Sequence, residues 1–397
     1  MSNLPLRELR VLDMSKVLAG PLCAQYLGDM GADVIKIETP KGGGDETRGW
    51  PPLREAEGTR TGAIFISANR NKRSVAIDLS TQAGREVVHR LARSADVAIA
   101  SFGPGVAEKL GVDASTLRGL NPRLVYCDIS GFGSAGPMRD GKGYDVILQA
   151  FCGMLSITGE SSGPPVRSPF SPVDQGTGLH ALIGIMAALY ERERTGIGGT
   201  VETSLFDTAT GFLAYFLQNY WERGTEPVRP GSGHESLCPY QVFETATKPL
   251  ILGVANDSLW QRFCALASLE DIKDDPRFAT NAARVAHRDE TLARVCEALK
   301  ERDRADWLQL LDAAGIPCAP LNSLGEFAAH PHTRESGMVF DYEHPAFGKL
   351  SSVAQPVRLN GERTQVRRPV PMHGEHTREV LTELGYTTSE INALLER

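Results

Sequence analysis

The sequence predicts an α/β protein in which a large parallel-sheet domain is followed by a smaller α+β domain. Apolar runs with strand character alternate with helical patterns through the first part of the chain, as in a parallel sheet covered by helices. The 397 residues exceed what one hydrophobic core usually fills. Residues 224–233, rich in proline, glycine and arginine, then interrupt the pattern and mark a domain boundary.

The first elements form a β-α-β unit. Residues 10–14, RVLDM, predict a buried strand, a helix runs from Pro21 to Gly31, and residues 34–38 predict a second strand. Because such crossovers are right-handed, the two strands are expected to be parallel. The loop after the first strand reads SKVLAGP and lacks the GxGxxG fingerprint, so NAD or FAD binding is not favoured.

Residues 40–68 are rich in glycine, proline and charge, and they predict a long surface loop. The elements expected next are a strand at 74–79, a helix at 81–94, a strand at 97–100, a short helix at 107–110 and a strand at 124–129. Arg70, Lys72 and Arg73 stand immediately before the first of these strands. They form either a solvated charged edge or a phosphate site at the end of a strand.

Glycine-rich residues 130–144 follow a strand, where open α/β sheets usually bind ligands. A long apolar helix is expected after Asp174, and it ends at Gly196. Its apolar residues recur at helical spacing: Leu179, Leu182, Ile183, Met186 and Leu189. A strand at 200–203 and a helix at 206–222 complete this part of the chain.

The smaller domain follows the break at 224–233. Its expected elements are a strand pair at 240–245 and 250–254 and helices at 256–266 and 287–314, and residues 315–320 leave it. Short strands are expected within 339–359 and terminal helices within 375–395. The expected division is a large domain at 1–223, a small domain at 224–325 and a C-terminal segment at 326–397.

Composition excludes several classes of protein. The formal net charge of -7 argues against non-specific nucleic-acid binding. No apolar run approaches the roughly 20 residues of a membrane span, and the first residues lack the apolar stretch of a secretory signal. The seven cysteines are scattered and include no CxxC pair, so a reducing cytoplasm is expected rather than a zinc site or a disulfide framework.

Asp174 stands at the start of the long helix, and its position has two interpretations. As an N-cap, its side chain would accept a hydrogen bond from a backbone N–H of the first turn. As a nucleophile, it would be kept ionised by the helix N-terminus. Gly176 and Gly178 would then leave room for a substrate and expose backbone N–H groups to an oxyanion. The local sequence leaves both interpretations open.

Nine motifs occur in order along almost the whole chain. They are VLAGPLCAQYLGDMGADVIKIE at 17–38, DETRGW at 45–50, NRNKRS at 69–74, SFGPG at 101–105, GYD at 143–145, SPVDQGTG at 171–178, PYQVF at 239–243, GIPCAP at 315–320 and GEHT at 374–377. Together they resemble the class III CoA-transferase family, the group of formyl-CoA and carnitine CoA-transferases. The DETRGWPP and GHESLCPYQVF stretches are similar to the branch that uses succinyl-CoA and dicarboxylates such as glutarate.

This resemblance implies a Rossmann-like large domain to which the C-terminal segment returns, and two chains interlocked as a homodimer. It implies that CoA lies along the large domain and reaches Asp174 as the catalytic residue. The residues that match the family's CoA contacts are Lys16, Val17, Leu18, Ala19, Phe102 and Lys142. Lys72 and Arg73 are the further phosphate candidates.

Three positions depart from the family. Ser101 stands where asparagine is frequent, Lys109 where arginine is frequent, and Thr39 where some members have arginine. Lys109 keeps a positive charge for a phosphate but loses the bidentate fork of arginine. CoA affinity or pose is therefore expected to differ, while the chemistry is retained.

The implied reaction is nucleophilic catalysis through an anhydride and an aspartyl-CoA thioester of Asp174. It requires no metal and no resident cofactor, because CoA is itself a substrate. The anhydride must be kept from water. The glycine-rich loops at 141–143 and 231–233 are either lids for this purpose or ordinary turns.

Tyr144 bears on the choice of reaction. The related α-methylacyl-CoA racemases carry a histidine at this position, and a phenol is a poor substitute for imidazole as a base near neutral pH. Transfer is therefore favoured over racemisation. Tyr144 is either a hydroxyl donor to the substrate or a buried tyrosine bonded to a backbone carbonyl, and His234 and Tyr240 are candidate contacts for the acceptor carboxylate. The remaining alternatives are a CoA-binding protein without activity and a nicotinamide oxidoreductase.

Overall fold

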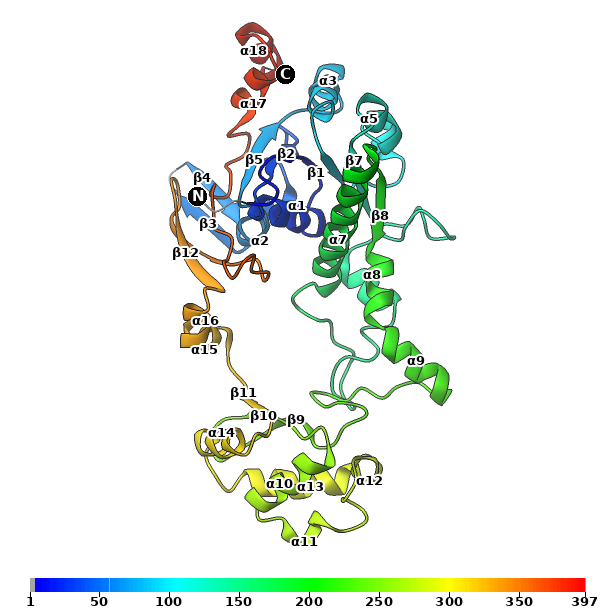
Figure 1. The fold of residues 1–397 in the computed structure, drawn as a ribbon, viewed down its shortest axis with the longest axis vertical. Helices are drawn as coiled ribbons and strands as arrows, with labels where there is room; N and C mark the ends of the chain where they lie inside the picture. The colour runs from blue at the N-terminus through cyan, green and yellow to red at the C-terminus, as the bar shows by residue number, and fades with distance from the viewer. Residues whose placement is uncertain (1–3, 57, 397) are drawn as a thin grey trace. The chain divides into compact units, whose positions relative to one another are not determined.

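The computed structural model describes residues 4–56 and 58–396. The chain folds into two compact units, and Figure 1 labels most of their elements. The first unit contains the chain up to Met154, Ser168–Asn219 and the chain from Pro331 onward, and the second contains Leu155–Arg167 and Tyr220–His330. These units differ from the division at 1–223, 224–325 and 326–397 mainly at residues 155–167. That segment joins the second unit because the Gly231 N–H donates to the Gly159 carbonyl at 3.0 Å and Arg229 Nε donates to the Glu160 carbonyl at 3.1 Å.

The first unit is built on a six-stranded sheet with the order β5-β2-β1-β6-β7-β8. Its strands are β1 (Arg10–Met14), β2 (Asp33–Glu38), β5 (Lys72–Ala76), β6 (Val97–Ala100), β7 (Val125–Ser130) and β8 (Thr200–Ser204). Every neighbouring pair in this sheet is parallel. The predicted α/β class with a parallel sheet is therefore confirmed.

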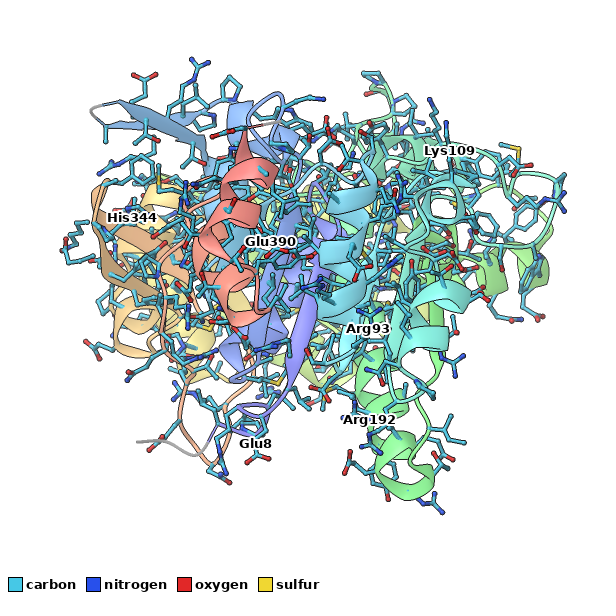
Figure 2. All side chains as sticks on the ribbon, turned by 90° about the horizontal axis from the view of Figure 1, so that it is seen from above. Glu8, Arg93, Lys109, Arg192, His344 and Glu390 are labelled. Carbon is cyan, nitrogen blue, oxygen red and sulfur yellow. The ribbon has the colours of Figure 1, made fainter. Side chains whose placement is uncertain are left out.

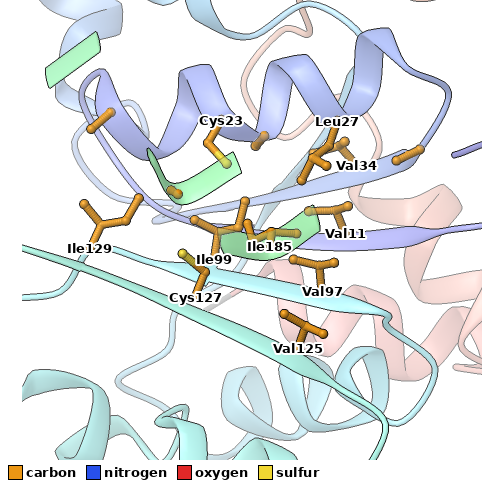
Figure 3. Close-up of a cluster of buried hydrophobic side chains, with 14 of the residues drawn as sticks. Val11, Cys23, Leu27, Val34, Val97, Ile99, Val125, Cys127, Ile129 and Ile185 are labelled. Atoms are coloured by element: carbon orange, nitrogen blue, oxygen red, sulfur yellow. The ribbon is translucent and has the colours of Figure 1, made fainter. Parts of the chain in front are cut away.

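Helices cover both faces of the sheet because side chains alternate along each strand. Val11 of β1 packs with α1 (Ala19–Asp29) and α7 (Pro172–Thr195), in the cluster that Figure 3 shows. Leu12, the next residue, packs on the opposite face with α3 (Gln82–Ala92), α5 (Ala114–Leu120), α17 (Thr377–Glu383) and α18 (Thr388–Leu395). The terminal helices α17 and α18 thus return to the sheet, as expected.

The prediction of a long surface loop at 40–68 is wrong. This stretch contains η1 (Glu46–Gly49), β3 (Leu53–Ala56), β4 (Thr59–Gly62) and α2 (Ala63–Ala68). Its polar residues are not all solvated, because Arg48 is buried against Glu38 with donor–acceptor distances of 2.8 and 2.7 Å. Two of the charged residues in this segment, Asp45 and Arg48, are therefore buried in ion pairs, whereas others such as Lys41 and Arg60 are exposed.

The first unit also contains short helices and a hairpin. These are α4 (Val106–Leu110), α6 (Asp145–Phe151), α8 (Leu205–Phe212), α16 (Pro331–Glu335), β12 (Val339–His344) and β13 (Gly348–Val353). The helix expected at 206–222 is interrupted at Leu213, after which α9 (Ala214–Arg223) begins. No helix among the described residues is long and apolar enough to cross a membrane.

The second unit is α+β and has its own core around Trp260, Phe263 and Trp307. Its antiparallel sheet has the order β11-β10-β9, with β9 (Tyr240–Phe243), β10 (Leu250–Gly253) and β11 (Cys318–Pro320). Its helices are α10 (Asp257–Leu266), α11 (Glu270–Lys273), α12 (Asn281–Ala286), α13 (Arg288–Leu299), α14 (Arg304–Ala313) and α15 (Leu324–Ala329). Residues 315–320 do not leave this unit directly, because β11 pairs with β10.

The long helix α7 has two unlike faces. Ala181, Ile185 and Leu189 are buried in the core of the first unit. On the other face, Leu179, Ile183, Met186 and Tyr190 form one stripe at helical spacing and are exposed, Ile183 by 65% and Tyr190 by 70%. Part of the apolar pattern that predicted this helix is therefore not used in the core of the single chain.

Candidate active site

A cleft of about 1160 Å³ opens in the first unit where β1, β6 and β7 end. Because these strands are parallel, the segments that follow them lie at the same edge of the sheet. Most of the lining residues come from segments 16–20, 101–108, 128–136, 139–144 and 200–207, and Asp174 lines the cleft as well. The position after the strands agrees with the sequence analysis, and the whole lining belongs to one unit.

Asp174 is not the cap of α7. The N-cap residue is Ser171, whose side chain makes no capping hydrogen bond. The Asp145 carboxylate of α6 takes the capping role, because its Oδ2 accepts the N–H groups of Val173 at 2.8 Å and Asp174 at 3.2 Å. The Asp174 carboxylate lines the cleft, and the described residues give it neither a hydrogen bond nor an ion pair. The N-cap interpretation is therefore wrong.

The protonation of Asp174 differs from the sequence-based expectation. Burial, and then the nearby Asp145 carboxylate, raise the pKa of the Asp174 carboxyl to about 7. The first N–H groups of α7, which were expected to favour the anion, are already bonded to Asp145. Near neutral pH, Asp174 is therefore divided between its acid and its carboxylate form.

Gly176 and Gly178 do not leave room for a substrate. Both are buried, and a Cβ at either position would collide with a neighbour: the Phe212 ring beside Gly176 and the Ala19 carbonyl beside Gly178. They allow α7 to pack closely on α8 and α1, so their expected role at an oxyanion is not supported. Thr177 between them donates its hydroxyl to the Val173 carbonyl at 2.7 Å.

Several predicted CoA contacts come together in the cleft. Its lining includes Lys16, Val17, Leu18, Ala19, Phe102, Lys142 and Tyr144. Tyr144 is 53% exposed, so the interpretation as a buried tyrosine is wrong. Ser101, one of the departures from the family, also lines the cleft, and its Oγ accepts the N–H of Lys16 at 3.0 Å.

Lys72 does not reach the cleft. Its side chain is fully buried, and its ammonium group donates to Asp13 Oδ2 at 2.9 Å, to the Pro21 carbonyl at 2.8 Å and to Asn69 Oδ1 at 2.9 Å. All three protons are used, so Lys72 has no donor left for a phosphate. It is neither a phosphate ligand nor part of a solvated edge.

The side chains of Arg73 and Arg70 are also buried and held in ion pairs. Arg73 contacts Asp33 at 2.5 Å and Glu383 at 2.7 Å, and Arg70 contacts Asp29 at 2.6 Å. Both of the interpretations offered for this basic cluster are therefore corrected. Lys109 is different, because it is exposed on α4 next to the cleft residue Glu108, as labelled in Figure 2, but it does not line the cleft.

His234 and Tyr240 lie together within the second unit. Their rings meet edge to face with centroids 5.6 Å apart, and the His234 N–H donates to the Tyr240 carbonyl at 3.1 Å. His234 Nδ1 accepts the N–H of Ser236 at 3.0 Å. Gly231 to Gly233 precede them, whereas Gly141 to Gly143 line the cleft of the first unit.

Sequence reasoning missed three residues that shape the site. Asp145 lies in the GYD motif, which predicts no role for it, although it caps α7 beside Asp174. Lys36 and Asp45 were not singled out, although they form a buried ion pair at 3.1 Å whose two members each bond the backbone of residues 15–17. A lysine inside the apolar strand VIKIE was the available signal, because buried lysines are nearly always paired.

Comparisons with known proteins agree with this architecture. A model described as CoA-transferase family III matches residues 6–377. The succinate–glutarate CoA-transferase of Agrobacterium fabrum is 40% identical over 383 residues, covering 96% of both chains. The human succinyl-CoA:glutarate CoA-transferase is 34% identical over 398 residues, covering 100% of this chain and 90% of that protein.

Solved structures show the same similarity. A CAIB/BAIF family protein from Brucella suis has a TM-score of 0.86 and 37% identity, covering 96% of this chain and 100% of that one. Rv3272 from M. tuberculosis has a TM-score of 0.83 and 31% identity, covering 95% of this chain and 99% of that one.

Proposed function

This chain belongs to CoA-transferase family III, and we propose that it transfers CoA from an acyl-CoA to a free carboxylic acid through covalent adducts of Asp174. One observation carries the assignment of this residue. Asp174 places a carboxylate without a hydrogen-bond donor in the cleft, beside a second carboxylate that already occupies the helix N-terminus. A carboxylate that is not stabilised by hydrogen bonds remains available as a nucleophile.

The reaction proceeds by two exchanges. An Asp174 carboxylate oxygen bonds to the thioester carbon, the carbon–sulfur bond breaks, and CoA leaves as a thiolate from a mixed anhydride. The thiolate then attacks the aspartyl carbonyl, which releases the donor acid and leaves Asp174 as a CoA thioester. The acceptor carboxylate attacks that thioester, and the returning thiolate takes the acceptor acyl group and regenerates the Asp174 carboxylate. The anhydride and the thioester are similarly activated, so neither exchange is steeply uphill.

The cleft lining supports a position for CoA. Residues 16–19 and Phe102 offer apolar and backbone surface, and Lys142 adds a positive charge for phosphate groups. Lys109 stands near the lining with a second charge. Lys72 and Arg73 have no part in this proposal because their donors are bonded to protein groups. Arg139 also lines the cleft and replaces them as a candidate phosphate contact.

We infer succinyl-CoA as the donor and a short dicarboxylate such as glutarate as the acceptor. The support is the name of the relatives that are 40% and 34% identical to this chain. Tyr144 is the candidate hydroxyl donor to the substrate, and His234 and Tyr240 are the candidate contacts for the acceptor carboxylate. Cytoplasmic localisation, inferred from the scattered cysteines, stays part of this proposal.

We infer further that the functional form is an interlocked homodimer. The exposed stripe of Leu179, Ile183, Met186 and Tyr190 on α7 supports this, because contiguous apolar surface marks an interaction site. Phe151 of α6 and Phe212 of α8, on helices that pack against α7, are exposed as well. Size-exclusion chromatography with light scattering tests the dimer.

A labelling experiment tests the covalent mechanism. The purified protein is incubated with succinyl-CoA, treated with hydroxylamine, and digested for peptide mass spectrometry. We expect a hydroxamate on Asp174, which disappears when the protein is first chased with glutarate. An Asp174→Ala variant is the control for labelling of other carboxylates. An unmodified Asp174 after treatment with several acyl-CoAs would contradict the proposal.

A further inference from the structure

A set of four charged side chains is buried in the first unit next to residues 15–19, which we call the cleft loop. Asp13, Lys36, Asp45 and Lys72 each expose about 1% of the side chain or less. Two lysines and two aspartates leave this set without net charge. None of the four lines the cleft, so any effect on a ligand must pass through the cleft loop.

The Lys36–Asp45 pair bonds to both sides of Lys16. Lys36 Nζ donates to the Ser15 carbonyl at 2.8 Å and lies 3.1 Å from Asp45 Oδ2. The same Oδ2 accepts the N–H of Val17 at 3.3 Å. Lys36 and Asp45 therefore connect the Ser15 carbonyl to the Val17 N–H, on either side of Lys16.

Val17 is the residue that needs this support. Its φ of 67° lies in the left-handed region, which is a genuine outlier for a β-branched side chain. Such a conformation persists only where the surrounding structure holds it. Asp45 is itself held in place, because its Oδ1 accepts the N–H of Thr47 at 3.1 Å and the hydroxyl of Thr47 at 2.8 Å.

We infer that Asp45, together with Lys36, is a positioning residue for the acyl-CoA substrate. The pair holds Val17 in its left-handed conformation, so residues 16–19 form the wall of the cleft before CoA arrives and binding does not have to order them. This inference rests on the proposed position of CoA. Replacing both members of a buried ion pair with neutral residues often costs little stability, so an effect on CoA binding can be separated from an effect on folding.

The main test is the double variant Lys36→Met with Asp45→Asn, which removes one positive and one negative charge. We expect the KM for succinyl-CoA and the Kd of free CoA to rise about tenfold, because ordering the loop then draws on binding energy. The kcat at saturating succinyl-CoA should change less than about threefold, because Asp174 is untouched. Isothermal titration calorimetry gives the Kd without requiring any chemistry.

A control replaces another ion pair of the first unit, in which the Arg192 side chain is buried and the Asp96 side chain is 26% exposed. Arg192, near the end of α7 (Figure 2), pairs with Asp96 at 2.9 Å, next to the start of β6 and therefore at the opposite edge of the sheet from the cleft. Arg192→Met with Asp96→Asn should leave the KM and the Kd unchanged. Equal losses of CoA affinity in both double variants would overturn the inference.

A rescue variant separates positioning from a general loss of structure. Glycine adopts positive φ freely, so Val17→Gly in the Lys36→Met, Asp45→Asn background should recover part of the CoA affinity. Absence of any recovery, or wild-type CoA affinity in the double variant, overturns the positioning role. If the wild-type protein binds CoA but is not labelled at Asp174, the covalent mechanism fails, and the calorimetric comparison still decides this inference.

Discussion

Two carboxylates of the first unit, the buried Asp13 and the half-buried Asp174, behave in opposite ways. Asp13 lies beneath the cleft loop, where burial favours its neutral form but Lys72 and then Lys36 outweigh burial and lower its pKa. Asp174 faces the cleft, where burial raises its pKa and no cation opposes this effect. The charge of Asp145 raises the pKa further, to about 7. The comparison teaches that, of these two carboxylates, the one with lysine partners has the lowered pKa and the one without a cation nearby has the raised pKa.

The largest effect is expected from Asp174→Asn. The amide has nearly the same shape but is a poor nucleophile, so exchange should fall by at least about 10⁴-fold and hydroxylamine labelling should vanish. The stability of the folded protein should not fall. The raised pKa means that ionising Asp174 is disfavoured in the folded state, and this cost in stability is fully present above about pH 7. The neutral amide removes the cost. Melting temperature at pH 8, measured beside turnover, checks both parts. An exchange rate near that of the wild type would contradict the assignment of Asp174 as the nucleophile.

The second effect concerns stability. Lys72→Met leaves Asp13 without its direct partner and should cost about 3–5 kcal/mol of unfolding free energy at pH 7. Because the paired Asp13 has a lowered pKa, its contribution is present above the unfolded pKa and is lost as the pH falls through the folded one. The loss in Lys72→Met should therefore shrink in acid, as urea titrations at several pH values would show. Adding Asp13→Asn should restore most of the stability, and an equal loss in the double variant would contradict this account.

The smallest effect is expected from Asp145→Asn, which retains an oxygen to cap α7 but removes the charge. In the wild type, adduct formation should increase with pH and reach half its maximum near pH 7, because the ionised Asp174 is the nucleophile. The variant should shift this midpoint to lower pH. Since burial is the larger cause, the midpoint should still lie above the ordinary range of an aspartate. Single-turnover labelling across pH measures it, and an unchanged midpoint would show that Asp145 acts only as a cap.

Patterns of local origin were predicted well from the sequence. RVLDM at 10–14 coincides with β1, and the helix expected at 81–94 is α3 at 82–92. These predictions succeed because the periodicity of a strand or helix depends on residues that are close in the sequence. The position of the cleft after the parallel strands follows from topology. The exposed stripe on α7 shows the limit, since Ile183 and Ile185 look equally apolar in the sequence and only packing tells them apart.

The sequence by itself determined the β/α alternation, the family and the carboxylate at the start of α7. Tertiary structure alone decided what each charge contacts. Lys72 and Lys142 are both lysines in charged motifs, yet the ammonium group of Lys72 is fully hydrogen-bonded in the core, whereas Lys142 lines the cleft. Asp145 and Asp174 both begin helices, yet only one receives the N–H groups of α7. The physical reason is that a charge takes its role from partners and solvent within a few ångströms, and those partners come from distant parts of the chain.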